Sequence, residues 1–308
     1  MKIKFIIFWF ICSFSVKGNN NEPISFLNNL TNQLLSARYD SLKVDYSNKI
    51  FDKLNSELSN LNSPILYSKI NRIAKVYSDD SKLIIFTWTY TVLNGNNIIE
   101  GIYRYIKDDG SFIIKRLKHS NNFNSKLILA TLSEEDWFGA LYYSIIQQKV
   151  GRVTYYTLLG LNPINKYKNI KIIDAARFDG INGLIFGASI FEKNDIKVNR
   201  IIFEYPESVV FMLKYQDKEK RIIFDHLSNK NVNNPTNQSL PDMSYDGLTF
   251  KKNRWVFNES IELRNKSKSN RKHSKLSSTG MYGIKKKKFF NRKTYWCRFF
   301  YTLISWEK

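Results

Sequence analysis

Asp225 and His226 form the polar pair of the chain that is best suited to chemistry. They lie at the end of Arg221–Asp225, an apolar run that predicts a strand. An imidazole beside a carboxylate can act as a general base that the carboxylate orients. A histidine at a strand end is more often bonded to a loop carbonyl, and the sequence has no G-x-S-x-G nucleophile motif. The pair therefore stays a candidate catalytic site for one alternative function, hydrolysis.

A second candidate set consists of aromatic residues in the middle of the chain, because aromatic rings pack on the apolar faces of sugars and peptides. Its members are Trp137, Tyr142, Tyr155 and Tyr156. Residues of this kind in two-faced apolar strands more often belong to a core. The four residues are candidates for ligand binding, with core packing as the competing interpretation.

The sequence predicts no metal site and no cofactor. His119 and His273 are the only other histidines, and neither H-E-x-x-H nor C-x-x-C occurs. Cys12 lies in a segment that we expect to be removed, so Cys297 has no partner within the mature chain.

The segment Asp136–Leu161 organises the predicted fold. Two aromatic-rich apolar runs, Trp137–Ile146 and Val153–Leu161, flank a polar break at Gln147–Arg152 that contains a glycine, which is a hairpin pattern. Both runs are apolar on both of their faces. A strand with two apolar faces normally lies in the centre of a sheet rather than at its edge, so we expect this hairpin at the heart of a β-rich core.

Helices are predicted before the strands. Pro23–Asn62 carries leucines and isoleucines at three- and four-residue steps, whereas from Ile65 the apolar period changes to two. Phe86–Val92 alternates aromatic residues with threonines, which predicts a half-buried strand. Asn162-Pro163 is expected to form a turn. The other predicted strands are Ile98–Ile106, Phe112–Leu117, Lys171–Phe178, Leu184–Phe191, Arg200–Tyr205, Val209–Tyr215, Arg221–Asp225, Leu248–Lys251 and Arg254–Asn258.

This order predicts an α+β fold: N-terminal helices followed by a predominantly antiparallel β meander, sandwich or barrel-like sheet. The polar stretch Lys118–Asn124 is the expected boundary between two parts. Residues 19–118 would hold the helices and a small meander, and residues 125–263 a β-rich domain.

The first residues predict export. Met1–Gly18 has two early lysines, an apolar stretch at Phe5–Val16 and small residues near its end, as a secretory signal peptide does. An uncleaved membrane anchor is the competing interpretation, disfavoured because the apolar stretch is short. We expect a protein of the periplasm or cell envelope that could also be associated with a membrane.

The positive charge is concentrated in the last residues. The net charge of +21 divides into +13 for Arg264–Lys308, +3 for Met1–Gly18 and +5 for the rest. The tail after residue 263 is rich in lysine and aromatic residues, and its first part is predicted to be disordered. It could bind anionic lipid or envelope polymer, or be an extension with no selected role. Export disfavours nucleic acid as a partner.

Several motifs resemble a family of exported bacterial proteins, best known from bacteroidetes, that has no assigned activity. The motifs are Asp136–Tyr143 (DWFGALYY), Thr154–Gly160 (TYYTLLG), Phe186–Ala188, Arg200–Tyr205 (RIIFEY), Ile223–Leu227 (IFDHL) and Ser244–Asp246. The chain departs from the family at Leu161-Asn162 and in its basic tail. The resemblance implies an exported bacterial protein and assigns no residue a role.

Taken together, the sequence predicts a non-enzymatic envelope protein with a structural or ligand-binding β-rich module. Its expected partners are an envelope polymer, an anionic lipid or another envelope protein. One alternative is an envelope hydrolase acting on glycan or peptide. The other is an anionic membrane-surface protein held by the basic tail.

Overall fold

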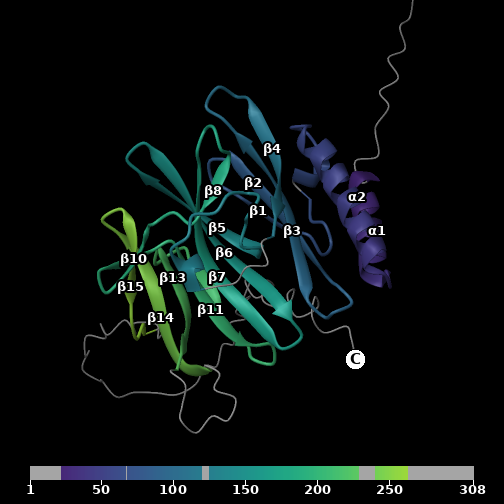
Figure 1. Cartoon of the computed structure of the whole chain (residues 1–308). Coiled ribbons are helices and arrows are strands. Elements are labelled where there is room, and N and C mark those ends of the chain that lie inside the picture. The colour runs from purple at the N-terminus through teal and green to yellow at the C-terminus, as the bar shows by residue number, and fades with distance from the viewer. Residues whose placement is uncertain (1–21, 67, 120–124, 229–239, 263–308) are drawn as a thin grey trace, which may run out of the picture. The chain divides into compact units, whose positions relative to one another are not determined.

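The computed structural model describes residues 22–66, 68–119, 125–228 and 240–262 (Figure 1). Nearly all of them belong to the first of two compact units, Met1–Ser260; the second is Ile261–Lys308. The expected signal peptide, Cys12, His273, Cys297 and the basic tail lie outside the described residues and stay predictions.

Two helices open the described chain, as the leucine spacing predicts. They are α1 (Glu22–Ser36) and α2 (Asp40–Leu58), followed by a short 3-10 turn, η1 (Pro64–Leu66). Their buried residues recur at helical spacing, and the Nε1 of Trp88 in the neighbouring sheet donates a hydrogen bond to Ser47 on α2 at 2.8 Å. The apolar faces of the helices therefore cover one face of a sheet.

That first sheet is an antiparallel meander in the order β1-β2-β3-β4. Its strands are β1 (Ala74–Tyr77), β2 (Leu83–Thr91), β3 (Asn97–Ile106) and β4 (Phe112–Lys118). The expected half-buried strand is wrong in one respect, because Thr87 on its polar face is only 1% exposed. The Thr87 hydroxyl accepts the Tyr142 N–H at 3.2 Å, so another layer covers this face of β2 at Thr87, whereas Thr91 stays exposed.

The predicted hairpin forms part of the second sheet. The strands of this sheet are β5 (Leu141–Val150), β6 (Val153–Asn165), β7 (Lys168–Phe178), β8 (Leu184–Phe186) and β11 (Arg200–Pro206). The path is β11-β7-β6-β5, with β8 on β7. Of the hairpin strands, β6 is an inner strand, but the expectation that neither lies at an edge is wrong for β5, which pairs only with β6 among the described strands. Val150 pairs with Val153, so the turn is tighter than the predicted break at Gln147–Arg152. The turn predicted at Asn162-Pro163 is wrong, because both residues pair with β7.

The third sheet has the order β10-β9-β15-β14-β13-β12. Its strands are β9 (Phe191–Lys193), β10 (Ile196–Val198), β12 (Leu213–Gln216), β13 (Arg221–Leu227), β14 (Pro241–Lys251) and β15 (Arg254–Asn258). The predicted strand Leu184–Phe191 is wrong as one element, since the chain breaks at Gly187, where φ is +82°, and continues in another sheet. Of Val209–Tyr215, only the last residues are extended in β12.

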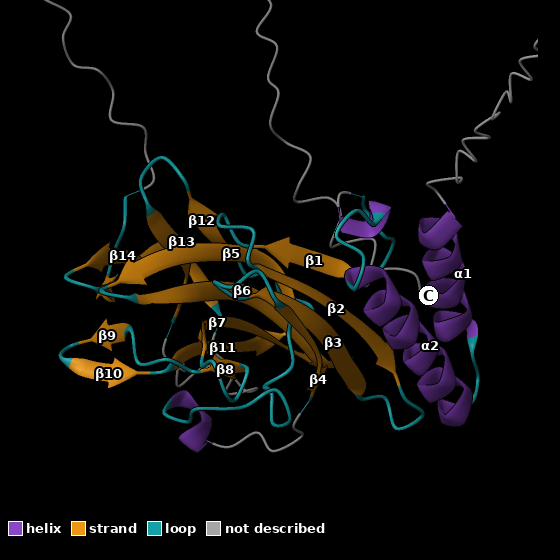
Figure 2. Cartoon of the chain, turned by 90° about the horizontal axis from the view of Figure 1, so that it is seen from above, coloured by secondary structure: helices purple, strands orange, loops and turns teal. Residues whose placement is uncertain are grey.

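The two helices lie along one side of the first sheet (Figure 2). Three hydrophobic clusters join the layers in turn. One lies between the helices and the first sheet, one between the first and second sheets, and one between the second and third sheets. The hairpin strands thus contact apolar neighbours on both faces, as their composition predicts. Tyr103 and Trp137 share a cluster, so a common core crosses the expected boundary at Lys118–Asn124. The fold is β-rich and mostly antiparallel, with β9 and β15 as a parallel pair, and it consists of N-terminal helices and layered sheets rather than a clear barrel.

Candidate functional site

His226 lies on β13, where a bulge between Asp225 and Leu227 interrupts the pairing with β14. Its Nδ1 is 2.7 Å from the Oδ2 of Asp246, whose side chain is 7% exposed. The other carboxylate oxygen of Asp246 accepts the N–H of Ser260 at 3.1 Å. The hydrogen bond to Asp246 raises the pKa of His226 above its ordinary value. The imidazole is therefore oriented by a buried carboxylate and is partly open to solvent, as proton transfer requires.

The carboxylate beside His226 is not the one that the sequence suggests. The Asp225 carboxylate accepts the backbone N–H of Met212 at 2.6 Å, and burial raises its pKa. Asp225 thus fixes the segment that leads into β12. The partner of His226 comes from the neighbouring strand, and only the register between β13 and β14 brings the two together.

Stability should depend on the charge of His226. Because its pKa is raised in the folded state, the contribution is complete below the ordinary pKa of about 6.5 and disappears as the pH rises through the raised value. The pair is partly exposed, so we expect a loss of less than about 1 kcal/mol. Urea unfolding between pH 6 and pH 9 should show this loss in the native chain. It should be absent in His226→Gln.

The candidate binding aromatics lie inside the molecule. Trp137, Tyr142 and Tyr156 are 0% exposed, and Tyr155 is half-buried against the cluster between the second and third sheets. The Nε1 of Trp137 donates to the Tyr142 hydroxyl at 2.9 Å, and the Tyr156 hydroxyl donates to Asp80 at 3.0 Å. These residues pack the core, so the interpretation of Trp137, Tyr142 and Tyr156 as an accessible binding face is corrected.

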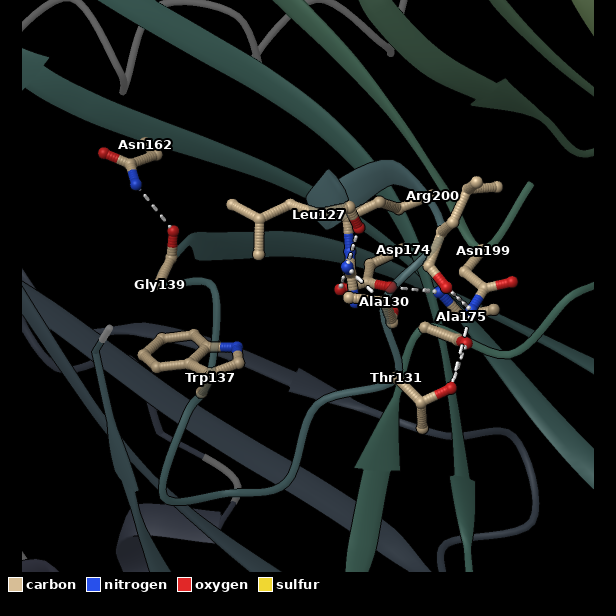
Figure 3. Close-up of polar contacts among 12 residues, drawn as sticks. Leu127, Ala130, Thr131, Trp137, Gly139, Asn162, Asp174, Ala175, Asn199 and Arg200 are labelled. Carbon is tan, nitrogen blue, oxygen red and sulfur yellow. Dashed lines mark hydrogen bonds and ion pairs between the residues drawn. The ribbon is translucent and has the colours of Figure 1, made fainter. Parts of the chain in front are cut away.

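A buried ion pair joins β7 to β11, and sequence reasoning missed it (Figure 3). Asp174 and Arg200 are both 0% exposed, and the Nε of Arg200 donates to the Asp174 Oδ2 at 3.3 Å. The Asp174 Oδ1 accepts the Ala175 N–H at 2.9 Å. Burial raises the pKa of Asp174, which the Arg200 charge opposes. Arg200 is the first residue of the RIIFEY motif. An arginine at the start of an apolar strand is the sequence feature that could have indicated a buried ion pair.

The same guanidinium holds the segment before β5. Its Nη1 donates to the carbonyl oxygens of Leu127, in the short 3-10 turn η2 (Ser125–Ile128), and of Ala130, the latter at 3.0 Å. Asn199 adds a bond from its Nδ2 to the Leu129 carbonyl at 2.8 Å. We call Asp174, Arg200 and these carbonyls the arginine clamp. It ties an irregular segment to the edge of the second sheet, and its charges are used within the fold.

An open cleft lies where β3 and β4 meet the residues after β4. It has a volume of about 310 Å³ and is lined by Ile98, Ile99, Glu100, Arg116, Lys118 and His119. Arg116 donates to Glu100 and to Asn48 of α2, and it lies over the ring of Phe51 at 4.8 Å. Lys118 is 59% exposed and pairs with Glu135. The cleft thus gathers apolar, cationic and anionic groups in one hollow.

His119 contributes a neutral imidazole to this cleft. Burial lowers its pKa to about 4, so the ring is uncharged at neutral pH. Gly139, with φ +81°, packs against the ring so closely that a Cβ there would overlap it. Asn162 bonds the Gly139 carbonyl at 2.9 Å and helps to fix that contact. Both ring nitrogens of His119 are shielded from solvent, so the ring forms an uncharged part of the cleft wall.

Protonation of His119 should destabilise the fold in acid. Its folded pKa lies below the ordinary value of about 6.5, so the unfolded chain binds the proton first and stability falls between pH 6.5 and pH 4. With an allowance for partial exposure, we expect a loss on the order of 2 kcal/mol. Urea unfolding at pH 7 and pH 4.5 measures it. His119→Gln should lose less on acidification than the native chain, whereas His226→Gln should lose more.

Within the described part of the chain, no three His, Cys, Asp or Glu side chains gather as metal ligands would. None of the helices described is long and apolar enough to cross a membrane. Comparison of the chain with protein-family profiles, with curated proteins and with solved structures found no match.

Proposed function

We propose that the chain is an exported envelope protein whose β-rich module binds a ligand at the cleft lined by Arg116, Lys118 and His119, without turnover. The resemblance of Asp136–Asp246 to exported bacterial proteins and the signal-like first residues support the location. The observation that supports binding is the cleft itself. It combines apolar contact with the cationic side chains of Arg116 and Lys118, and the uncharged ring of His119 forms part of its wall.

The chemistry of the cleft favours a ligand that has both an anionic and an apolar part. Arg116 presents a fixed planar guanidinium, because Phe51, Glu100 and Asn48 hold it. Lys118 is exposed, and its pair with Glu135 is weak enough to be exchanged for another anion. Among the partners expected from the sequence, an anionic envelope polymer fits these groups best, ahead of an anionic lipid or another envelope protein.

The test is co-sedimentation of the purified chain with peptidoglycan sacculi. Arg116→Gln together with Lys118→Gln should weaken binding at least about tenfold, because the two charges act at one place. Lys82→Gln is the matched control: it removes one cation from a pair with the exposed Asp108, at the end of the first sheet opposite the cleft. Equal binding by the cleft variant and this control would refute the cleft as the site. Vesicles of anionic lipid, with and without residues 264–308, form a separate arm for the membrane alternative.

A second candidate function is hydrolysis of an envelope glycan or peptide, and the observation that favours it is the His226–Asp246 pair at 2.7 Å. The same incubations should then release soluble fragments. His226→Gln would abolish the release while the protein stays folded, and Asp246→Asn would reduce it by altering the imidazole. Binding without release supports the first proposal, and release that depends on His226 supports hydrolysis.

A further inference from the structure

Strand β4 is an edge of the first sheet, and its hydrogen bonds have a defined direction. Across the β3–β4 turn, the Lys107 N–H donates to the Ser111 carbonyl at 2.7 Å. Ser111, Ile113, Lys115 and Leu117 therefore direct their backbone groups toward β3, since successive residues of a strand alternate. The backbone N–H and C=O groups that point away from β3 are therefore those of Phe112, Ile114, Arg116 and Lys118.

Among the described residues, the outward backbone groups of β4 find a hydrogen-bond partner at one end of the strand only. The Lys118 N–H donates to the Glu134 carbonyl at 2.8 Å, which agrees with the alternation. In the described chain, β3 is the only strand that pairs with β4, so Phe112, Ile114 and Arg116 present N–H and C=O groups along an open edge. Phe112 is 37% exposed, and Ile113 and Ile114 are half-buried.

Charges on edge strands often prevent pairing with another chain, but here they are compensated within the protein. Lys115 pairs with Glu134, whose side chain is 6% exposed. Arg116 pairs with Glu100, whose side chain is 15% exposed. The edge is therefore apolar at one end and nearly neutral at the other, so it lacks the repulsion that would keep a second edge away.

We propose that β4 pairs antiparallel with β4 of a second copy of this chain, with the two-fold axis at Ile114. In this register Ile114 faces its own counterpart, and Phe112 faces Arg116 of the partner subunit. Outward residues then face outward residues, so each facing pair can exchange both backbone bonds. The first sheet continues into the partner through this contact.

The alternative register centred on Lys115 is disfavoured. It would place Lys115 directly opposite its own counterpart, and like charges that face each other across strands are destabilising. Centring on Ile113 moves the overlap toward the Asp108–Gly110 turn and shortens the ladder. The register at Ile114 avoids both penalties. Because the shared edge is short, we expect a transient dimer that forms in the micromolar range or above, as small interfaces do.

The test is sedimentation velocity of the full chain over a wide range of concentration. The native chain should shift from monomer to dimer. Ile114→Pro should weaken the dimer at least about tenfold, because proline removes an outward N–H that β3 does not use. Ile114→Ala is the matched control: it removes the same packing, keeps the N–H and should change the dimer much less. A native chain that stays monomeric, or a dimer that Ile114→Pro leaves intact, overturns the proposal.

A charge pair tests the register without relying on proline. Ile114→Lys and Ile114→Glu should each be monomeric alone, because like charges would meet across the two-fold axis. Their equimolar mixture should associate, since lysine then faces glutamate. Association of either variant alone, or monomers in the mixture, would place the contact elsewhere and refute the pairing at Ile114.

Discussion

Asp174→Ala lowers the free energy of unfolding by about 3–5 kcal/mol, which is the usual cost of removing one partner of a buried ion pair. Arg200 is 0% exposed, so without Asp174 its charge stays buried among the Leu127 and Ala130 carbonyls with no counter-ion. Urea unfolding followed by far-UV circular dichroism at pH 7 measures the loss. The loss of unfolding free energy then includes the penalty for the uncompensated charge of Arg200 as well as the lost hydrogen bond.

The same two strands provide the matched control. Lys168 on β7 pairs with Glu204 on β11, and their side chains are 45% and 53% exposed. Glu204→Ala should cost less than about 1 kcal/mol, because water solvates the remaining lysine. Asp174→Leu combined with Arg200→Met should recover most of the stability, since both charges are then removed. Equal costs for Asp174→Ala and Glu204→Ala would show that the arginine clamp is not a buried charge network.

The layered core was predictable because burial on both faces leaves a direct mark on composition. Trp137–Ile146 and Val153–Leu161 carry apolar residues on both faces, and a strand with this composition needs a layer on each side. The helices were equally predictable from their leucine spacing. The order of the sheets was not, because it depends on which strands meet, and β9 pairs with β15 from the far end of the chain.

Local rules failed where tertiary contacts decided the conformation. Pro163 reads as a turn, yet it is accommodated within β6, close to the shift in register between Pro163 and Asn165. The threonine face of β2 reads as solvent-exposed, but Thr87 serves as an acceptor for the next layer. Both errors arise because a sequence pattern shows which residues are polar or turn-forming, but not which tertiary contacts those residues make.

The candidate site was predictable only in part, for the same reason. His226 could be singled out as a proton-transfer residue from its type and place at a strand end. Its partner Asp246 lies on another strand, so adjacency in sequence pointed to Asp225 instead. The cleft could not be foreseen, because it brings Ile98–Glu100 together with Arg116–His119 only after β3 and β4 have paired.

Gly187→Ala should cost about 2–5 kcal/mol of stability, a range that overlaps the effect of Asp174→Ala. Gly187 has φ +82°, and a side chain in this left-handed region costs about 1–2 kcal/mol. The new Cβ would also overlap the Ala130 carbonyl and the Arg200 Nη2, which adds the cost of overpacking, about 1–3 kcal/mol. The methyl group cannot move aside, because the Gly187 N–H donates to the Ala175 carbonyl at 2.8 Å.

Gly95→Ala separates the two contributions. Gly95 has the same φ of +82° in the β2–β3 turn, but a Cβ there meets nothing within 4 Å. It should therefore show the backbone cost alone, measured by the same urea unfolding. If the excess at Gly187 comes from overlap with the arginine clamp, it should shrink in an Arg200→Met background, where the guanidinium no longer occupies the space. Equal costs at Gly95 and Gly187 would show that conformation, and not the clamp, requires this glycine.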